Sequence, residues 1–218
     1  MQEKRRRKLL TTTNMKWLVL FCFPVVVSAY SVVVRTRSWE EAGRLLNERS
    51  VRAVVVENAV PLGIQKAWAQ ARSGEVRGPA GTLRETLSAV CEDEEVLENA
   101  EALARDFATH AVGGDRTRFK AAVATNERAM QPCPKIHTDD VSVRCLIAAV
   151  GPGTVVVDRA FLLPFDDRLP DSAFFQANTG DALLLKGRKW GLAARHRSPK
   201  NHQSNKRVLL SMDRLDDV

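Results

Sequence analysis

The spacing of apolar residues along the chain changes near residue 116. Before this point apolar residues recur every three or four positions, which is typical of amphipathic helices. The clearest case spans residues 94–111, with apolar side chains at Val96, Leu97, Ala100, Leu103, Ala104, Phe107, Ala108 and Ala111. Beyond residue 116 apolar and polar residues alternate, as they do in half-buried strands, and turns rich in Gly and Pro separate the alternating segments. The pattern therefore predicts a helical part followed by a β-rich part.

The same pattern predicts individual elements. Ser38 and Thr82 each precede a glutamate by three residues, which is the spacing of a capping box and predicts two helix starts. Residues 52–57 are a strand candidate between helices. In the second part, alternation predicts strands near residues 116–125, 141–150, 154–157, 182–185 and 208–212. We expect an α+β fold in which N-terminal helices, in residues 31–115, pack on a C-terminal antiparallel barrel, in residues 116–218.

Residues 1–30 have the three-part pattern of a targeting segment. Basic residues come first, an apolar run over residues 17–27 follows, and Val27 and Ala29 take the −3 and −1 positions of a cleavage site. The apolar run is shorter than the roughly 20 residues that a membrane-spanning helix needs. Cleavage would leave no stable membrane span, and the destination would be the secretory pathway or an organelle. The alternative is a basic tail before a buried strand, because residues 25–34 are rich in valine.

The formal charge of +7 is concentrated at the N-terminus. Six basic residues and one glutamate give the first 16 residues a charge of +5, so the remaining chain carries only +2. The chain also has a single tyrosine and no aromatic platform for stacking bases, and both features argue against nucleic-acid binding. Its four cysteines include no Cys-x-x-Cys pair, so they indicate neither a disulfide framework nor a zinc ribbon.

The strongest candidate for chemistry is the pair His137 and Asp139, just before a predicted strand. In an extended chain, residues two positions apart project from the same face. His196 is the candidate for a second imidazole, which would complete the two-histidine, one-carboxylate ligand set of non-haem Fe(II) sites. Three further side chains are alternative ligands: Cys133, Asp140 and His202. The competing interpretation is a core histidine at His137, bonded to Asp139, with His196 on an exposed loop.

Arg207 follows His196 by eleven residues. In cupin-like oxygenases that use 2-oxoglutarate, a basic residue at about this distance from the last histidine binds the co-substrate carboxylate. A guanidinium suits that role because it pairs bidentately with carboxylates, and Thr154 or Ser198 can hydrogen-bond the same group. A cupin-like double-stranded β-helix is the form of antiparallel barrel that places metal ligands on inner strands at its mouth.

Linked motifs in the last hundred residues resemble the family called domain of unknown function 1826. They are Cys-x-Lys-x-His-x-Asp at 133–139, Gly-Pro-Gly-Thr at 151–154, Gly-Asp-x-x-Leu-Leu-Lys-Gly at 180–187, Trp190, and His-Arg-Ser-Pro at 196–199. The chain departs from the family at Ile136, where an aromatic residue is usual, at Val155-Val156, and in a shortened stretch between Trp190 and His196. These departures keep the candidate ligands but alter the walls of the site.

Three functions remain open from the sequence. The first is an enzyme resembling the Fe(II)/2-oxoglutarate dioxygenases, acting on an unknown substrate. The second is a non-catalytic zinc- or iron-binding protein that uses the same ligands. The third is a cupin-like barrel without metal that serves as an interaction module.

Overall fold

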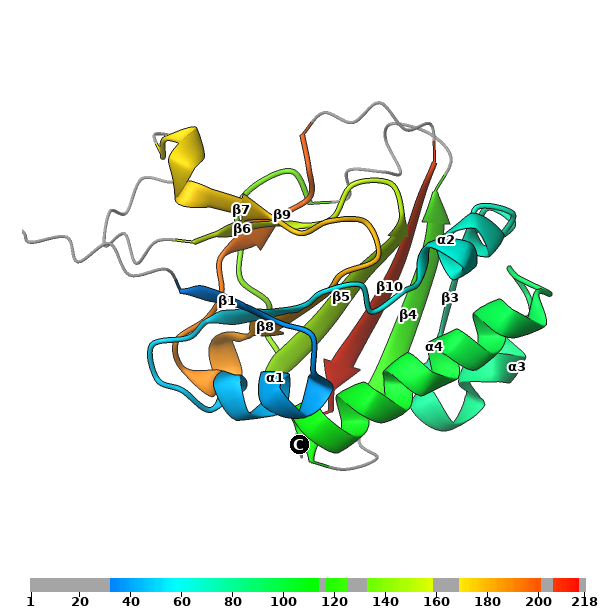
Figure 1. Ribbon diagram of the computed structural model, residues 1–218, viewed down its shortest axis with the longest axis horizontal. Helices are drawn as coiled ribbons and strands as arrows, with labels where there is room; N and C mark the ends of the chain where they lie inside the picture. The colour runs from blue at the N-terminus through cyan, green and yellow to red at the C-terminus, as the bar shows by residue number, and fades with distance from the viewer. Residues whose placement is uncertain (1–31, 114–116, 125–132, 159–168, 201–205, 216–218) are drawn as a thin grey trace, which may run out of the picture.

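The computed structural model describes residues 32–113, 117–124, 133–158, 169–200 and 206–215. These residues form an α+β fold with one large and one small sheet (Figure 1). The strands of the large sheet are β1 (Val33–Thr36), β2 (Ala53–Val56), β3 (Gly74–Pro79), β4 (Thr117–Ala124), β5 (Val143–Val150), β8 (Ala182–Lys186) and β10 (Arg207–Arg214). Their order is β1–β2–β8–β5–β10–β4–β3, with β1 and β2 parallel and the other neighbours antiparallel.

The small sheet consists of β6 (Val155–Val157), β7 (Phe174–Gln176) and β9 (His196–Arg197), with β6 in the middle. The helices are α1 (Trp39–Leu46), α2 (Leu62–Trp68), α3 (Leu83–Leu87) and α4 (Glu94–Asp106), and a π-helical turn, Phe107–Val112, continues α4. Short 3-10 turns lie at Ala80–Thr82, Asp171–Ala173 and Arg188–Trp190. Figure 1 shows the helices on one side of the large sheet and the small sheet on the other.

Alternation along the strands divides the large sheet into two faces. On β10, every second residue (Val208, Leu210 and Met212) belongs to a buried cluster that includes residues of all the α-helices. A second buried cluster on the opposite face joins β2 and β8 to Val156 of the small sheet. The residues of β10 that alternate with the first set, Arg207, Leu209, Ser211 and Asp213, line a pocket on that opposite face. Because successive side chains of a strand point to opposite faces, one face of the sheet packs against the helices and the other lines the pocket.

Many predicted elements are present in the structure. The best predicted helix is α4 with its π-helical extension, and it ends at Gly113, whose φ of 74° favours glycine. Ser38 caps α1 as predicted, because its hydroxyl accepts a hydrogen bond from the Glu41 amide. The helix start predicted at Thr82 is also confirmed, because Thr82 is the N-cap of α3, but the predicted capping bond is wrong. The Thr82 hydroxyl donates instead to the carbonyl oxygen of Pro79.

Residues 31–115 supply helices, as expected, but also β1, β2 and β3. These three strands belong to the same sheet as β4, β5, β8 and β10 of the second part. The predicted targeting segment, residues 1–30, lies outside the described residues. In the described part of the chain, no helix combines the length and the apolar character needed to cross a membrane.

Candidate metal centre

The backbone brings His137 and His196 directly opposite each other. The amide of each residue donates to the carbonyl oxygen of the other, and both N···O distances are 2.9 Å. Two residues that exchange hydrogen bonds in an antiparallel pair project their side chains to the same side. The ring centroids are accordingly only 4.4 Å apart. Strand register therefore joins two histidines that are far apart in the sequence.

Asp139 joins the two histidines from the same segment as His137. Nε2 of His196 lies 3.1 Å from Oδ2 of Asp139, and Nε2 of His137 lies 3.7 Å from Oδ1. One possible ligand atom from each of the three side chains lies within 4.8 Å of the others. The interpretation of His196 as an exposed loop residue is wrong, because its side chain is buried and belongs to β9.

Both imidazole rings are fixed through their Nδ1 atoms. Nδ1 of His137 lies 3.0 Å from the carbonyl oxygen of Lys135, and Nδ1 of His196 lies 3.3 Å from that of Ala194. A carbonyl oxygen can only accept, so each Nδ1 carries a proton and donates it. In a neutral ring Nε2 is then an unprotonated acceptor, which is the usual state of a metal-binding histidine.

These nitrogens face the Asp139 carboxylate. Oδ2 of Asp139 is buried and lies 3.1 Å from Nε2 of His196. Buried polar atoms normally have a partner, so this oxygen and the imidazole nitrogen beside it share a cation, either a proton or a bound metal ion. Two imidazole nitrogens and one carboxylate oxygen are a suitable ligand set for Fe(II). The residues present thus fit a metal ion.

Arg144, on β5, holds the other oxygen of the Asp139 carboxylate. One terminal nitrogen of Arg144 donates to Oδ1 of Asp139 over 2.6 Å. Its Nε and its second terminal nitrogen donate to the two oxygens of Asp213 over 2.5 and 2.9 Å. Burial by itself raises the pKa of the Asp139 carboxyl, but the close approach of His196 and the charge of Arg144 outweigh this effect and lower it. The carboxylate is thus held ionised, with Oδ2 directed at the histidines.

A close approach at Gly187 fixes the segment that follows Asp139. The Gly187 amide donates to the carbonyl oxygen of Ser142 over 2.7 Å, and the Arg188 amide donates to that of Asp139 over 2.8 Å. A Cβ atom at Gly187 would lie only 1.9 Å from the carbonyl oxygen of Val141 and 3.1 Å from that of Asp139. Glycine is therefore needed here for packing space.

Gly187→Ala is expected to destabilise the metal-free protein by about 1–3 kcal/mol, because the backbone on one side must move. The same movement displaces Asp139 and is expected to weaken metal binding. Chemical denaturation and metal titration of the variant measure the two effects. Gly63→Ala is the matched control, because a Cβ at Gly63 has no atom within 4 Å and alanine favours its helix. Equal stability of the two variants would contradict this role for Gly187.

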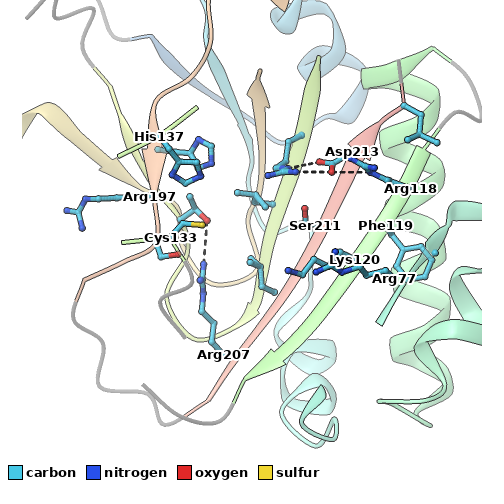
Figure 2. A pocket seen from close by; sticks show the side chains of 18 of the residues that line it. Arg77, Arg118, Phe119, Lys120, Cys133, His137, Arg197, Arg207, Ser211 and Asp213 are labelled. Atoms are coloured by element: carbon cyan, nitrogen blue, oxygen red, sulfur yellow. Dashed lines mark hydrogen bonds and ion pairs between the residues drawn. The ribbon is translucent and has the colours of Figure 1, made fainter. Parts of the chain in front are cut away.

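The centre opens into a pocket of about 690 Å³, which is within the usual range for small-molecule sites (Figure 2). All three residues predicted to bind a co-substrate line it: Arg207, Thr154 and Ser198. Arg207 is 2% exposed, and its guanidinium donates to the carbonyl oxygen of Pro152 over 3.2 Å and to Oγ1 of Thr154 over 3.4 Å. Burial lowers the pKa of Arg207 to about 10, so the side chain stays charged at neutral pH.

The alternative ligands have different positions. Cys133 lines the same pocket and is exposed, whereas Asp140 is exposed and pairs with Arg188 over 3.6 Å. His202 lies outside the described residues.

Arg144 pairs with two acids, Asp139 and Asp213. The carboxylates of Asp158 and Asp181 accept backbone amides, from Val32 and Val33 and from Asn58 and Asn178 respectively.

Three basic residues of the pocket were missed by sequence reasoning: Arg77, Arg118 and Lys120. Arg118 and Lys120 alternate with buried residues on β4, so period-2 analysis would have placed them on one face. Arg77 had no such signal, because residues 74–79 contain two glycines and a proline and do not look like a strand.

Comparison with known proteins gives one family and a common fold. A family model described as "Protein of unknown function (DUF1826)" matches residues 34–213. No curated protein is similar enough in sequence to match the chain. The crystal structure of the dioxygenase for auxin oxidation from rice is 15% identical, with a TM-score of 0.50 over 84% of this chain and 82% of that one. This likeness shows the fold alone.

Two further solved structures are similar at lower scores. The 2-oxoglutarate complex of the corresponding Arabidopsis thaliana dioxygenase is 14% identical, with a TM-score of 0.49 over 85% of this chain and 92% of that one. The epimerase SnoN of nogalamycin biosynthesis, in complex with Fe3+, α-ketoglutarate and nogalamycin RO, is 12% identical, with a TM-score of 0.47 over 82% of this chain and 83% of that one.

Proposed function

This chain belongs to the DUF1826 family, and on that premise we propose that it is an Fe(II)- and 2-oxoglutarate-dependent oxygenase. The observation that carries the proposal is the convergence of His137, His196 and Asp139, whose possible ligand atoms lie within 4.8 Å of one another. The two facing sheets are, in this proposal, a double-stranded β-helix with the metal at its mouth. The similarity in fold to the rice dioxygenase supports it.

His137, Asp139 and His196 would hold the metal ion. Three protein ligands of this kind leave coordination positions open, as the non-haem Fe(II) oxygenases require. Bound Fe(II) would supply the redox chemistry with O2 and the 2-oxoacid. Arg144 keeps one carboxylate oxygen occupied, so that Asp139 presents Oδ2 alone to the metal. The backbone carbonyls at Lys135 and Ala194 set the tautomers of the two ligand histidines.

Arg207, Thr154 and Ser198 would bind the carboxylate of 2-oxoglutarate that points away from the metal. The Arg207 guanidinium is oriented by Pro152 and Thr154 and sits in a buried part of the pocket, where a charge-assisted pair gains strength. Leu146 and Leu209 line the space beside it and would exclude water from the bound co-substrate.

The proposal is tested by the consumption of 2-oxoglutarate. Purified protein supplied with Fe(II), O2 and ascorbate as reductant is expected to convert 2-oxoglutarate to succinate and CO2, with the second oxygen atom reduced to water by ascorbate. His137→Ala is expected to abolish this conversion. A protein that binds metal without consuming 2-oxoglutarate would instead be a non-catalytic metal-binding protein.

Arg207→Gln is expected to weaken 2-oxoglutarate binding by about 10- to 100-fold, because a hydrogen-bonded charge contact contributes about 1.5–3 kcal/mol. Its Fe(II) affinity is expected to remain unchanged, because the Arg207 guanidinium donates to Pro152 and Thr154, neither of which is a proposed metal ligand. Both quantities follow from anaerobic titrations that monitor the visible absorption of the Fe(II)–2-oxoacid complex. Arg214→Gln, on the same strand but outside the pocket, is the matched control. Equal 2-oxoglutarate affinity in the two variants would place the co-substrate elsewhere.

A further inference from the structure

The pocket is considerably larger than the metal centre and extends across the large sheet to its β3 edge. Figure 2 shows Arg77, Lys120 and Arg118 on the opposite side of the pocket from His137. This second arm has no role in the proposed chemistry. Its side chains bear on the identity of the oxidised substrate, and the inference below rests on the proposed function.

Strand register places two rows of side chains across this arm. One row runs from Arg77 on β3 to Lys120 on β4, then to Ser211 on β10 and Leu146 on β5. Strands in a sheet are about 4.8 Å apart, so the backbone at Lys120 is about 10 Å from that at Leu146. The neighbouring row runs from Arg118 through Asp213 to Arg144, which contacts the ligand Asp139. A molecule lying along the first row would extend from the basic edge toward the metal centre.

The charges in this arm are not balanced. Arg77 and Lys120 share one carboxylate, that of Glu75, which lies 2.8 Å from the Lys120 ammonium. Arg118 and Arg144 face two carboxylates, those of Asp213 and Asp139, so their charges are balanced. The surplus positive charge therefore lies at Arg77 and Lys120, where it attracts an anion.

The basic residues are reachable by a ligand. The Arg77 side chain is 68% exposed and that of Lys120 is 39% exposed. Between them and the metal centre the lining includes Leu146 and Leu209 beside Ser211 on the sheet, with Leu215 exposed. The arm therefore combines a cationic end with an apolar floor that leads to the metal.

We propose that the oxidised substrate is a small amphiphilic anion, whose acidic group binds Arg77 and Lys120 and whose apolar body lies over Leu146 and Leu209. The acidic group is a carboxylate or a phosphate, since both accept hydrogen bonds from a guanidinium and an ammonium. Arg144 and Arg207 are engaged elsewhere, by Asp139 and Asp213 and by the proposed co-substrate respectively. The substrate is thus anchored at the end remote from the carbon that faces the metal.

The test uses octanoate as the probe and 1-octanol as its uncharged counterpart. Isothermal titration calorimetry of the metal-free full-length protein at low ionic strength is expected to give at least about tenfold tighter binding of octanoate. The Arg77→Gln/Lys120→Gln double variant is expected to lose that advantage and to bind octanol unchanged. Arg37→Gln/Lys66→Gln removes the same charge outside the pocket and is expected to bind octanoate like the wild type.

Glu75→Gln supplies a test in the opposite direction. Glu75 competes with the ligand for Arg77 and Lys120, so its removal is expected to strengthen octanoate binding by about threefold or more. A purely structural role for Glu75 would predict weaker binding.

Equal octanoate affinity in the wild type and the Arg77/Lys120 double variant would overturn the inference. So would a loss of octanoate binding confined to Arg207→Gln, because the probe would then occupy the co-substrate position. These measurements need neither metal nor turnover. Their failure is thus distinct from a failure of the proposed oxygenase activity, which is measured by 2-oxoglutarate consumption.

Discussion

Arg144→Met is expected to destabilise the metal-free protein by about 3–5 kcal/mol, which is the usual cost of removing one partner from a buried ion pair. Both carboxylates that Arg144 holds, those of Asp139 and Asp213, are only 8% exposed. Without the guanidinium, Asp139 loses its 2.6 Å ion pair and Asp213 keeps only Arg118, at 3.5 Å. Methionine keeps most of the side-chain volume, so the loss is electrostatic. Urea denaturation in the presence of a chelator measures it.

Two controls separate this effect from a general effect of arginine loss. Arg84 also pairs with two carboxylates, those of Glu94 and Glu101, but at the surface, where ion pairs contribute little. Arg84→Met is therefore expected to cost far less than Arg144→Met. Arg144→Lys keeps the positive charge, but an ammonium cannot bridge both acids as the planar guanidinium does. The stability of this variant is therefore expected to lie between those of the wild type and Arg144→Met. Equal losses in Arg84→Met and Arg144→Met would contradict the role assigned to Arg144.

His196→Ala is expected to weaken Fe(II) binding by at least about 100-fold, because loss of an outer-shell partner alone typically costs 10- to 100-fold. The variant also removes the imidazole that lies 3.1 Å from Oδ2 of Asp139. The measurement is an anaerobic competition titration against a chelator of known Fe(II) affinity. Circular dichroism on the same samples establishes that the fold is retained.

His110→Ala is the matched control, since it removes an exposed imidazole at the end of the long helix. It is expected to bind Fe(II) like the wild type. If His196→Ala also binds like the wild type, the metal lies elsewhere and the three-residue centre is wrong.

The sequence predicted that His137 and Asp139 lie together because one simple rule was sufficient. His137 and Asp139 are two residues apart in an extended segment, so their shared face followed from the period of a strand. The contribution of His196 could only be guessed, since the hydrogen-bonded register between it and His137 depends on a pairing across 59 positions of the sequence. Pairing of this kind is set by the whole sheet and leaves no local pattern.

Contacts between residues far apart in the sequence also explain what the sequence did not predict. Asp213 is 69 residues from Arg144, so nothing local identified their contact. The strand β3 is the edge of the large sheet, and its Gly-Glu-Val-Arg-Gly-Pro sequence has little strand propensity. It is a strand because β4 pairs with it over six residues, and that pairing brings Arg77 into the pocket. Helices and buried strands, which have clear periods, were predicted far better than this edge.

The most direct test of the account is the coordination of a bound metal ion. X-ray absorption spectroscopy of the protein loaded anaerobically with Fe(II) reports the number and type of ligands. One ion per chain is expected, with two imidazoles, oxygen ligands and no sulfur. Failure to bind one ion, or a spectrum dominated by a thiolate such as that of Cys133, would contradict the proposal that His137, Asp139 and His196 bind the ion together.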